Sequence, residues 1–126
     1  PALIKLPAAM LDHFGGVGKT TGDTPFALQL DCNSAVTVSL RVDGAESLSA
    51  RGHGVLRNDA TDDRAQGIGV QLLHHRQPVA LNHEMTLGSA SAGRFILQLT
   101  ARYYQTRPRI TAGQVSAVAT YTLHYD

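Results

Sequence analysis

Residues 15–21, Gly-Gly-Val-Gly-Lys-Thr-Thr, have the composition of a phosphate-binding loop. The standard loop requires a glycine five residues before the Gly18-Lys19-Thr20 unit, and His13 stands at that position. The variant form that begins Lys-Gly-Gly would require lysine in place of Phe14. Such a loop must also open a helix whose N-terminus faces the phosphates, and Gly22-Asp-Thr-Pro25 allows no helix. The sequence therefore predicts a glycine-rich loop between two strands, without nucleotide binding.

Six histidines and one acidic stretch are the candidate metal ligands of the chain. His74 and His75 are adjacent, so on a strand they would point to opposite faces and could not share an ion. The acidic stretch 58–63 lacks the glycine and the distal glutamate of a calcium loop, and we expect a flexible, solvated loop there. The remaining candidates show no ligand spacing: His13, His53, His83, His124 and the single Cys32. The sequence predicts no metal and no other cofactor.

Hydrolytic chemistry and binding to nucleic acid or membrane are also disfavoured. No serine stands in a Gly-x-Ser-x-Gly elbow, so the sequence predicts no enzyme. A formal net charge of +1 gives no basic surface for nucleic acid, and no apolar run approaches the roughly 20 residues of a membrane span.

With 43% hydrophobic and 17% charged residues, we expect one globular domain over residues 1–126. No signal peptide precedes Pro1, so we expect the chain to have been processed or cut.

The elements that would position any site are short strands, because apolar residues recur at every second position along most of the chain. We expect an antiparallel hairpin in which 26–32 and 36–42 pair across the Asn33-Ser34 turn. Other stretches complete the pattern: an edge strand at 2–6, loops at 8–24 and 106–112, an irregular polar stretch at 45–66, and strands at 68–72, 79–81, 85–87 and 95–103. With no helical period, these elements predict an all-β antiparallel sandwich.

The C-terminal stretch from Gly113 to Asp126 predicts one long, half-buried strand over residues 115–125. Only Val118 interrupts the alternation of polar and apolar residues. The alternating apolar positions are Val115, Ala117, Ala119, Tyr121, Leu123 and Tyr125. Exposed strand edges are usually protected by charge, proline or a bulge, and none of these devices occurs between Val115 and Tyr125. The chain stops before it could supply a neighbour, so the sheet is expected to be unfinished at this strand.

Several motifs, in this order, carry a resemblance to a known family: Phe14-Gly-Gly-Val-Gly18, Thr24-Pro-Phe26, Leu28-Gln-Leu-Asp-Cys32, Gln66-Gly-Ile-Gly-Val-Gln-Leu72, Leu99-Thr-Ala-Arg-Tyr103 and Thr111-Ala-Gly113. Gly113 is also fourteenth from the C-terminus and Tyr125 is penultimate. Over nearly its full length the chain resembles the pilins of chaperone–usher fimbriae, of the type 1 group. The resemblance implies an incomplete immunoglobulin-like sandwich that lacks its final, seventh strand. It also implies that a strand of a periplasmic pilus chaperone, and then of the next subunit, fills the gap.

The resemblance assigns roles to residues of the last strand. Gly113 would open space at one end of a donor-strand groove, and the alternating side chains would line it: Val115, Ala117, Ala119, Tyr121, Leu123 and Tyr125. Basic residues of the chaperone would hold the carboxylate of Asp126. The implied partners are the chaperone, the outer-membrane usher and the donor strand of an adjacent pilin. The implied location is a fimbrium on the bacterial surface, reached through the periplasm.

Two questions stay open at this stage. Cys32 falls on the core-facing side of its strand and is either a buried free thiol or half of a disulfide. In the family it pairs with a cysteine upstream of the Ile4-Lys-Leu-Pro7 position, so the chain either starts after that partner or does without the bridge. The domain is either the C-terminal pilin domain of a two-domain tip adhesin or a pilin without its N-terminal extension. The alternative functions are a fimbrial adhesin domain that itself binds a receptor or carbohydrate, and a hydrolase.

Overall fold

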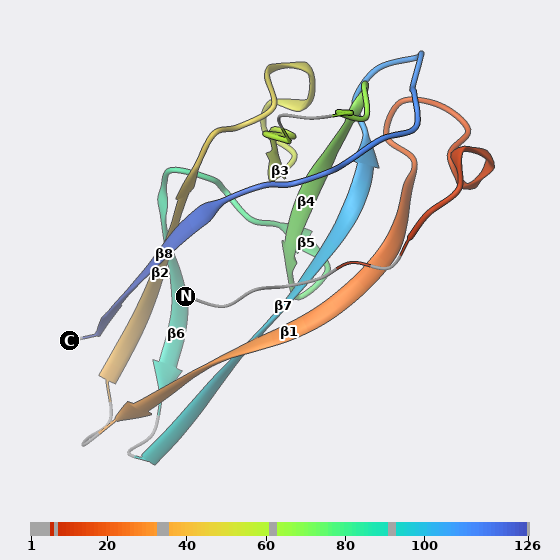
Figure 1. Ribbon diagram of the computed structural model, residues 1–126. Helices are drawn as coiled ribbons and strands as arrows, with labels where there is room; N and C mark the ends of the chain where they lie inside the picture. The colour runs from red at the N-terminus through yellow and green to blue at the C-terminus, as the bar shows by residue number, and fades with distance from the viewer. Residues whose placement is uncertain (1–5, 7, 33–35, 61–62, 91–92, 126) are drawn as a thin grey trace.

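The computed structural model describes residues 6, 8–32, 36–60, 63–90 and 93–125, which form strands and two short 3-10 turns (Figure 1). The turns are η1 (Leu11–His13) and η2 (Leu48–Ala50). The strands are β1 (Thr20–Cys32), β2 (Val36–Gly44), β3 (Val55–Leu56), β4 (Ile68–His74), β5 (Gln77–Pro78), β6 (Glu84–Ala90), β7 (Gly93–Gln105) and β8 (Ala119–Tyr125).

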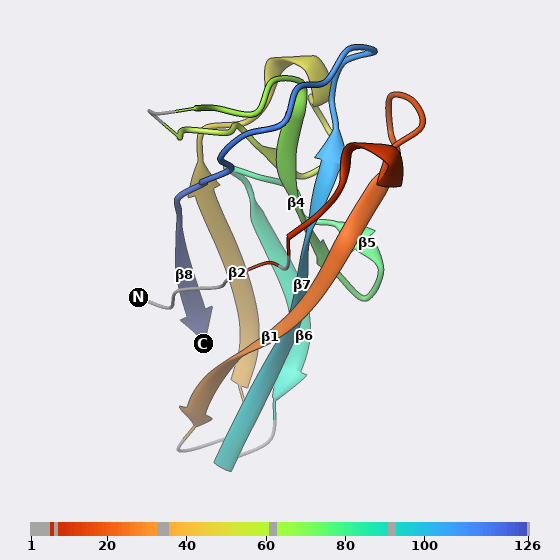
Figure 2. The same ribbon diagram turned by 45° about the vertical axis from the view of Figure 1, so that its right-hand side comes forward.

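These strands form two sheets that pack as layers (Figure 2). A five-stranded sheet has the order β1-β7-β4-β3, with β5 paired to β4, and a three-stranded sheet has the order β6-β2-β8. Every pairing between these strands is antiparallel. Apolar side chains of both layers meet in one core: Leu28, Leu40, Val42, Leu56, Val70, Leu72, Val79, Leu81, Leu97, Leu99 and Ala101. The prediction of an all-β antiparallel sandwich is confirmed.

The expected hairpin between 26–32 and 36–42 is wrong. β1 belongs to the five-stranded sheet and pairs with β7, where Phe26 lies opposite Leu99. β2 belongs to the other sheet and pairs with β6 and β8. Alternation along a strand fixes which side chains face the core but not which strand lies alongside, and sandwiches often connect consecutive strands across the two sheets. The turn residues 33–35 lie outside the described residues.

Two other stretches also differ from the prediction. The 45–66 stretch, expected to be polar and irregular, contributes core residues: Ala50 and Val55 pack with Tyr104, and His53 stacks on the same ring at 6.0 Å. This cluster helps to explain why Ile68–Leu73 of β4 are buried on both faces. The expected strand 79–81 is wrong, because β5 ends at Pro78; Val79 and Leu81 are buried without a named strand.

Both ends of the chain also differ from the prediction. The loop expected over 8–24 ends early, since β1 already begins at Thr20 and has an irregularity between Thr21 and Thr24. The edge strand expected at 2–6 falls, except for Leu6, outside the described residues. The last strand is shorter than expected, because regular pairing begins at Ala119 rather than at Val115. Among the described residues only β2 pairs with β8, so β8 is an edge strand.

Candidate binding site at the edge of the last strand

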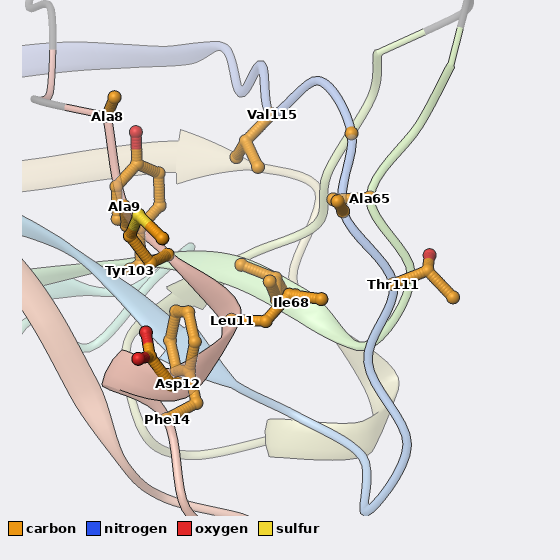
Figure 3. A pocket seen from close by; sticks show the side chains of 13 residues that line it. Ala8, Ala9, Leu11, Asp12, Phe14, Ala65, Ile68, Tyr103, Thr111 and Val115 are labelled. Atoms are coloured by element: carbon orange, nitrogen blue, oxygen red, sulfur yellow. The ribbon is translucent and has the colours of Figure 1, made fainter.

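A cavity of about 640 Å³ lies between the segment that leads into β1 and the segment that leads into β8 (Figure 3). Val115, Ile68 and Tyr103 surround it from three separate segments. The other lining residues are Ala8, Ala9, Met10, Leu11, Asp12, Phe14, Ala65, Thr111, Ala112 and Gly113. The lining is mostly apolar, so the cavity suits an apolar side chain better than a charged one. Burial raises the pKa of Tyr103 above its ordinary value of 10.0, so its phenol is neutral at physiological pH.

The N-terminal wall of the cavity is exposed to solvent on its outer side. It contains η1, which has no buried residue, and the side chains of Met10 and Leu11 are 64% and 45% exposed. Two hydrogen bonds close the turn locally: His13 N donates to Met10 O at 2.9 Å, and Met10 N to His13 Nδ1 at 3.3 Å. This wall therefore presents apolar side chains to solvent beside an apolar cavity.

The C-terminal wall, residues 111–115, is fixed by backbone hydrogen bonds to the loop that follows β3. Gln114 N donates to Asp63 O at 2.6 Å, Ala65 N donates to Gln114 O at 3.0 Å, and Asp59 N donates to Ser116 O at 2.7 Å. Asn58, Ala60 and Ala65 of that loop are buried. The expectation of a solvated loop at 58–63 is therefore wrong for Asn58 and Ala60, whereas Asp63 is exposed as expected; residues 61–62 lie outside the described residues.

β8 offers a backbone edge and apolar side chains to a further strand. Leu123 lies opposite Leu40 of β2, and Leu123, Val115 and Ala117 pack partly buried against the core. Ala119 is exposed, and Tyr121 is 43% exposed. The backbone of Tyr125 pairs with Val38, but its side chain and Asp126 lie outside the described residues. A strand added beside β8 would satisfy its free backbone groups and cover these apolar side chains.

The other predicted candidates lie apart from this cavity. In the Gly15–Thr21 stretch, residues 15–19 lead into β1, which begins at Thr20. Two of its amides are already hydrogen-bonded: Gly18 N donates to Gln105 O at 2.9 Å and Lys19 N to Gly16 O at 3.1 Å. The prediction of a loop that opens a strand rather than a helix is confirmed. Cys32 ends β1 opposite Gly93. The described residues do not include its side chain, so neither the free thiol nor the disulfide is tested.

The expectation that His74 and His75 point to opposite faces of a strand is wrong. The rings of His74 and His75 stack, with centroids 4.0 Å apart and planes at 21°, instead of pointing to opposite faces. His75 has a φ of 49°, so it stands in the turn after β4 and not in the strand. Burial, and secondly the neighbouring His75, lower the pKa of His74 below 6.5. In the part of the chain that the structure describes, no three His, Cys, Asp or Glu residues gather as a metal site, and no helix has the length and apolarity to cross a membrane.

Sequence reasoning missed most of the cavity. Tyr103 could have been found, because it continues the alternating run Phe95, Leu97, Leu99 and Ala101. Ala65 and Ile68 come from the stretch after β3, whose approach to residues 111–115 depends on contacts distant in sequence. Alternation carries no signal for such contacts.

Comparison with known proteins agrees with this architecture. The family model described as fimbrial protein matches residues 1–126. A fimbria adhesin protein of Klebsiella pneumoniae is 34% identical over 122 residues, which are 88% of this chain and 38% of that protein. The type 1 fimbrin D-mannose specific adhesin of Escherichia coli K12 is 29% identical over 105 residues, which are 83% of this chain and 34% of the adhesin. The chain thus spans about a third of the length of these relatives.

Two solved structures share the fold. A crystal structure of a Burkholderia pseudomallei antigen and type I fimbria protein gives a TM-score of 0.81 at 25% identity and covers 98% of this chain and 82% of that one. A chaperone-usher pilus structure gives a TM-score of 0.79 at 16% identity and covers 100% of this chain and 82% of that one. The resemblance to chaperone–usher pilins is confirmed, and this chain belongs to the fimbrial protein family.

Proposed function

We propose that this domain joins subunits of a fimbria by accepting a foreign strand beside β8. One observation carries the proposal: β8 is a sheet edge without a second partner among the described strands, and its Leu123 is only partly buried against the core. The cavity beside Val115 extends the apolar surface toward the start of the strand. An extended segment with alternating apolar side chains matches both features, since its backbone pairs with β8 and its side chains cover the core.

Family membership supports a proposal for the order of partners. A fimbrial protein is a structural or adhesive subunit of a surface fibre, and such families are not enzymatic. In this proposal a periplasmic chaperone supplies the first strand, an outer-membrane usher receives the complex, and an adjacent pilin supplies the final strand. The donor groove consists of the positions inferred from the sequence, Gly113 to Tyr125, with Asp126 as the chaperone's anchor point.

Amide hydrogen exchange measured by NMR tests where the strand enters. In an antiparallel pair only every second residue exchanges hydrogen bonds with its neighbour, so alternate amides of β8 point away from β2. A synthetic peptide with alternating apolar residues should slow the exchange of that outward set within Ala119–Tyr125. A control peptide of the same composition in scrambled order should leave it unchanged. Binding of the first peptide without protection at β8 would contradict the proposal.

The adhesin relatives suggest carbohydrate binding as a second function, and a glycan array separates the two. The relative named as D-mannose specific is matched over only 34% of its length. The cavity beside β8 has few polar lining side chains, namely Asp12, Tyr103 and Thr111. Sugars are held by several convergent polar groups, so we expect this domain to give no signal on the array. Specific binding by the domain alone would favour the adhesin function.

A further inference from the structure

The side chain of Asn58 is a buried connection between the loop after β3 and the segment that leads into β8. It is 6% exposed, and its carboxamide makes four hydrogen bonds to the backbone. Nδ2 donates to Ala65 O at 3.1 Å and to Gln114 O at 2.8 Å. Oδ1 accepts from Ala60 N at 3.0 Å and from Ser116 N at 3.0 Å. Each partner is a backbone group of fixed polarity, so only this orientation of the amide satisfies all of them.

These bonds fix one wall of the cavity. Gln114 and Ser116 lie on either side of Val115, and Asn58 holds both, although 56 and 58 residues separate them from it. The side chains of Gln114 and Ser116 are exposed, so in residues 114–116 only Val115 packs against the core. Together with the backbone hydrogen bonds of Gln114 and Ser116 described above, the Asn58 side chain holds Val115 against the core, ahead of the regular pairing that begins at Ala119.

We infer that Asn58 is a positioning residue for strand binding, an assignment that rests on the function proposed above. A strand that runs along β8 toward the cavity must pass Val115. If residues 114–116 were free to move, binding would include the entropic cost of ordering them. Asn58 removes this cost in advance, so its loss weakens donor binding beyond its effect on folding.

Asn58→Asp tests this inference by calorimetric titration of the folded protein with the alternating donor peptide. The introduced carboxylate can still accept from Ala60 N and Ser116 N but cannot donate, and it faces the carbonyl oxygens of Ala65 and Gln114. We expect the donor-peptide Kd to rise about tenfold or more at pH 7. Protonation at acidic pH restores one donor, so part of the affinity should return. The wild type serves as the reference at each pH, because it has the same charged residues around the site. These are Arg57, Asp59, Asp63 and Arg64.

Asn58→Ser is a second variant in case the first does not fold. Its hydroxyl can keep the local bond to Ala60 N but is too short to reach residues 114–116, so a similar rise in Kd without the acid recovery is expected. Gln71→Glu is the matched control, because Gln71 is a buried carboxamide that bonds His53 O and Arg102 and does not line the cavity. It should change the melting temperature but leave the donor-peptide Kd within twofold.

The outcomes distinguish the positioning role of Asn58 from the proposed function of accepting a strand beside β8. If the wild type binds the peptide and both Asn58 variants bind it equally well, the positioning role is wrong and the proposed function stands. If the wild type does not bind the peptide, the proposed function fails, and the positioning role fails with it.

Discussion

The backbone of Gly113 passes so close to the carbonyl oxygen of Asp63 that a β-carbon at Gly113 would collide with it. That β-carbon would also lie 2.6 Å from Ala65 N. Both neighbours are backbone atoms that hydrogen-bond Gln114, so they cannot move aside without breaking the contact between the two segments. Only glycine allows this approach, and the approach sets the C-terminal wall of the cavity.

Gly113→Ala should therefore destabilise the domain by about 1–3 kcal/mol, as expected for overpacking against a rigid neighbour. Thermal unfolding of the domain measures the change. Gly15→Ala is the control, since nothing lies within 4 Å of the β-carbon it would add. Equal melting temperatures for the two variants would show that the contact with Asp63 is not tight.

Leu123→Ala should weaken both the fold and chaperone capture. Leu123 lies opposite Leu40. It is partly buried and packs against two groups of core side chains, one that contains Leu40 and one around Val38. Truncation of such a residue costs about 2 kcal/mol or somewhat more and removes apolar surface that a donor strand would cover. Co-purification with the chaperone measures capture. Thr122→Ala, at an exposed position of the same strand, should leave the yield unchanged. A normal yield for Leu123→Ala would count against strand capture beside β8.

Lys19→Ala should have no effect on folding or assembly. The side chain is exposed, and the backbone amides of Gly18 and Lys19 already bond Gln105 O and Gly16 O. These two amides are therefore not available to bind a phosphate, and the loop leads into a strand rather than into the N-terminus of a helix. Isothermal titration with ATP is the check. Micromolar binding that is lost in the variant would overturn this expectation.

His74 should make the stability depend on pH. Burial, with a smaller contribution from His75, lowers its pKa below 6.5, so the folded state binds this proton less readily than the unfolded state. The resulting stability is present above pH 6.5 and is lost as the pH falls through the lowered pKa. Urea unfolding between about pH 7.5 and pH 5 should show a smaller loss for His74→Gln than for the wild type. His83→Gln, at an exposed position, is the control. Parallel pH profiles for wild type and His74→Gln would refute the assignment.

The sequence predicted the fold class well because alternation is a local signal. Leu28, Leu40, Leu97 and Leu99 were all placed on core-facing strand positions, and each is buried. Strand pairing depends instead on contacts between distant segments. The expected partner of β1 was therefore wrong, since both β2 and β7 offered a suitable apolar face.

The candidate site was only partly predictable for a related reason. The free edge of the last strand could be predicted, because its apolar residues alternate and no charged residue or proline between Val115 and Tyr125 protects an edge. The strand nevertheless begins at Ala119, because Gln114 and Ser116 bond the loop around Asn58 instead of extending the β8 ladder. The polar stretch 58–63 resembles a solvated loop in composition, and nothing local marks Asn58 as a buried connection.

Thermal unfolding of the isolated domain, with and without the alternating donor peptide, tests the central claim most directly. An added strand would cover the half-buried Leu123, Val115 and Ala117 and pair with the free edge of β8. At a peptide concentration about 100 times its Kd, binding contributes about 2.7 kcal/mol. For a domain of this size the melting temperature should rise by about 10 °C. The scrambled peptide should produce no rise. A high melting temperature without peptide, unchanged when the donor peptide is added, would show that the sandwich is already complete.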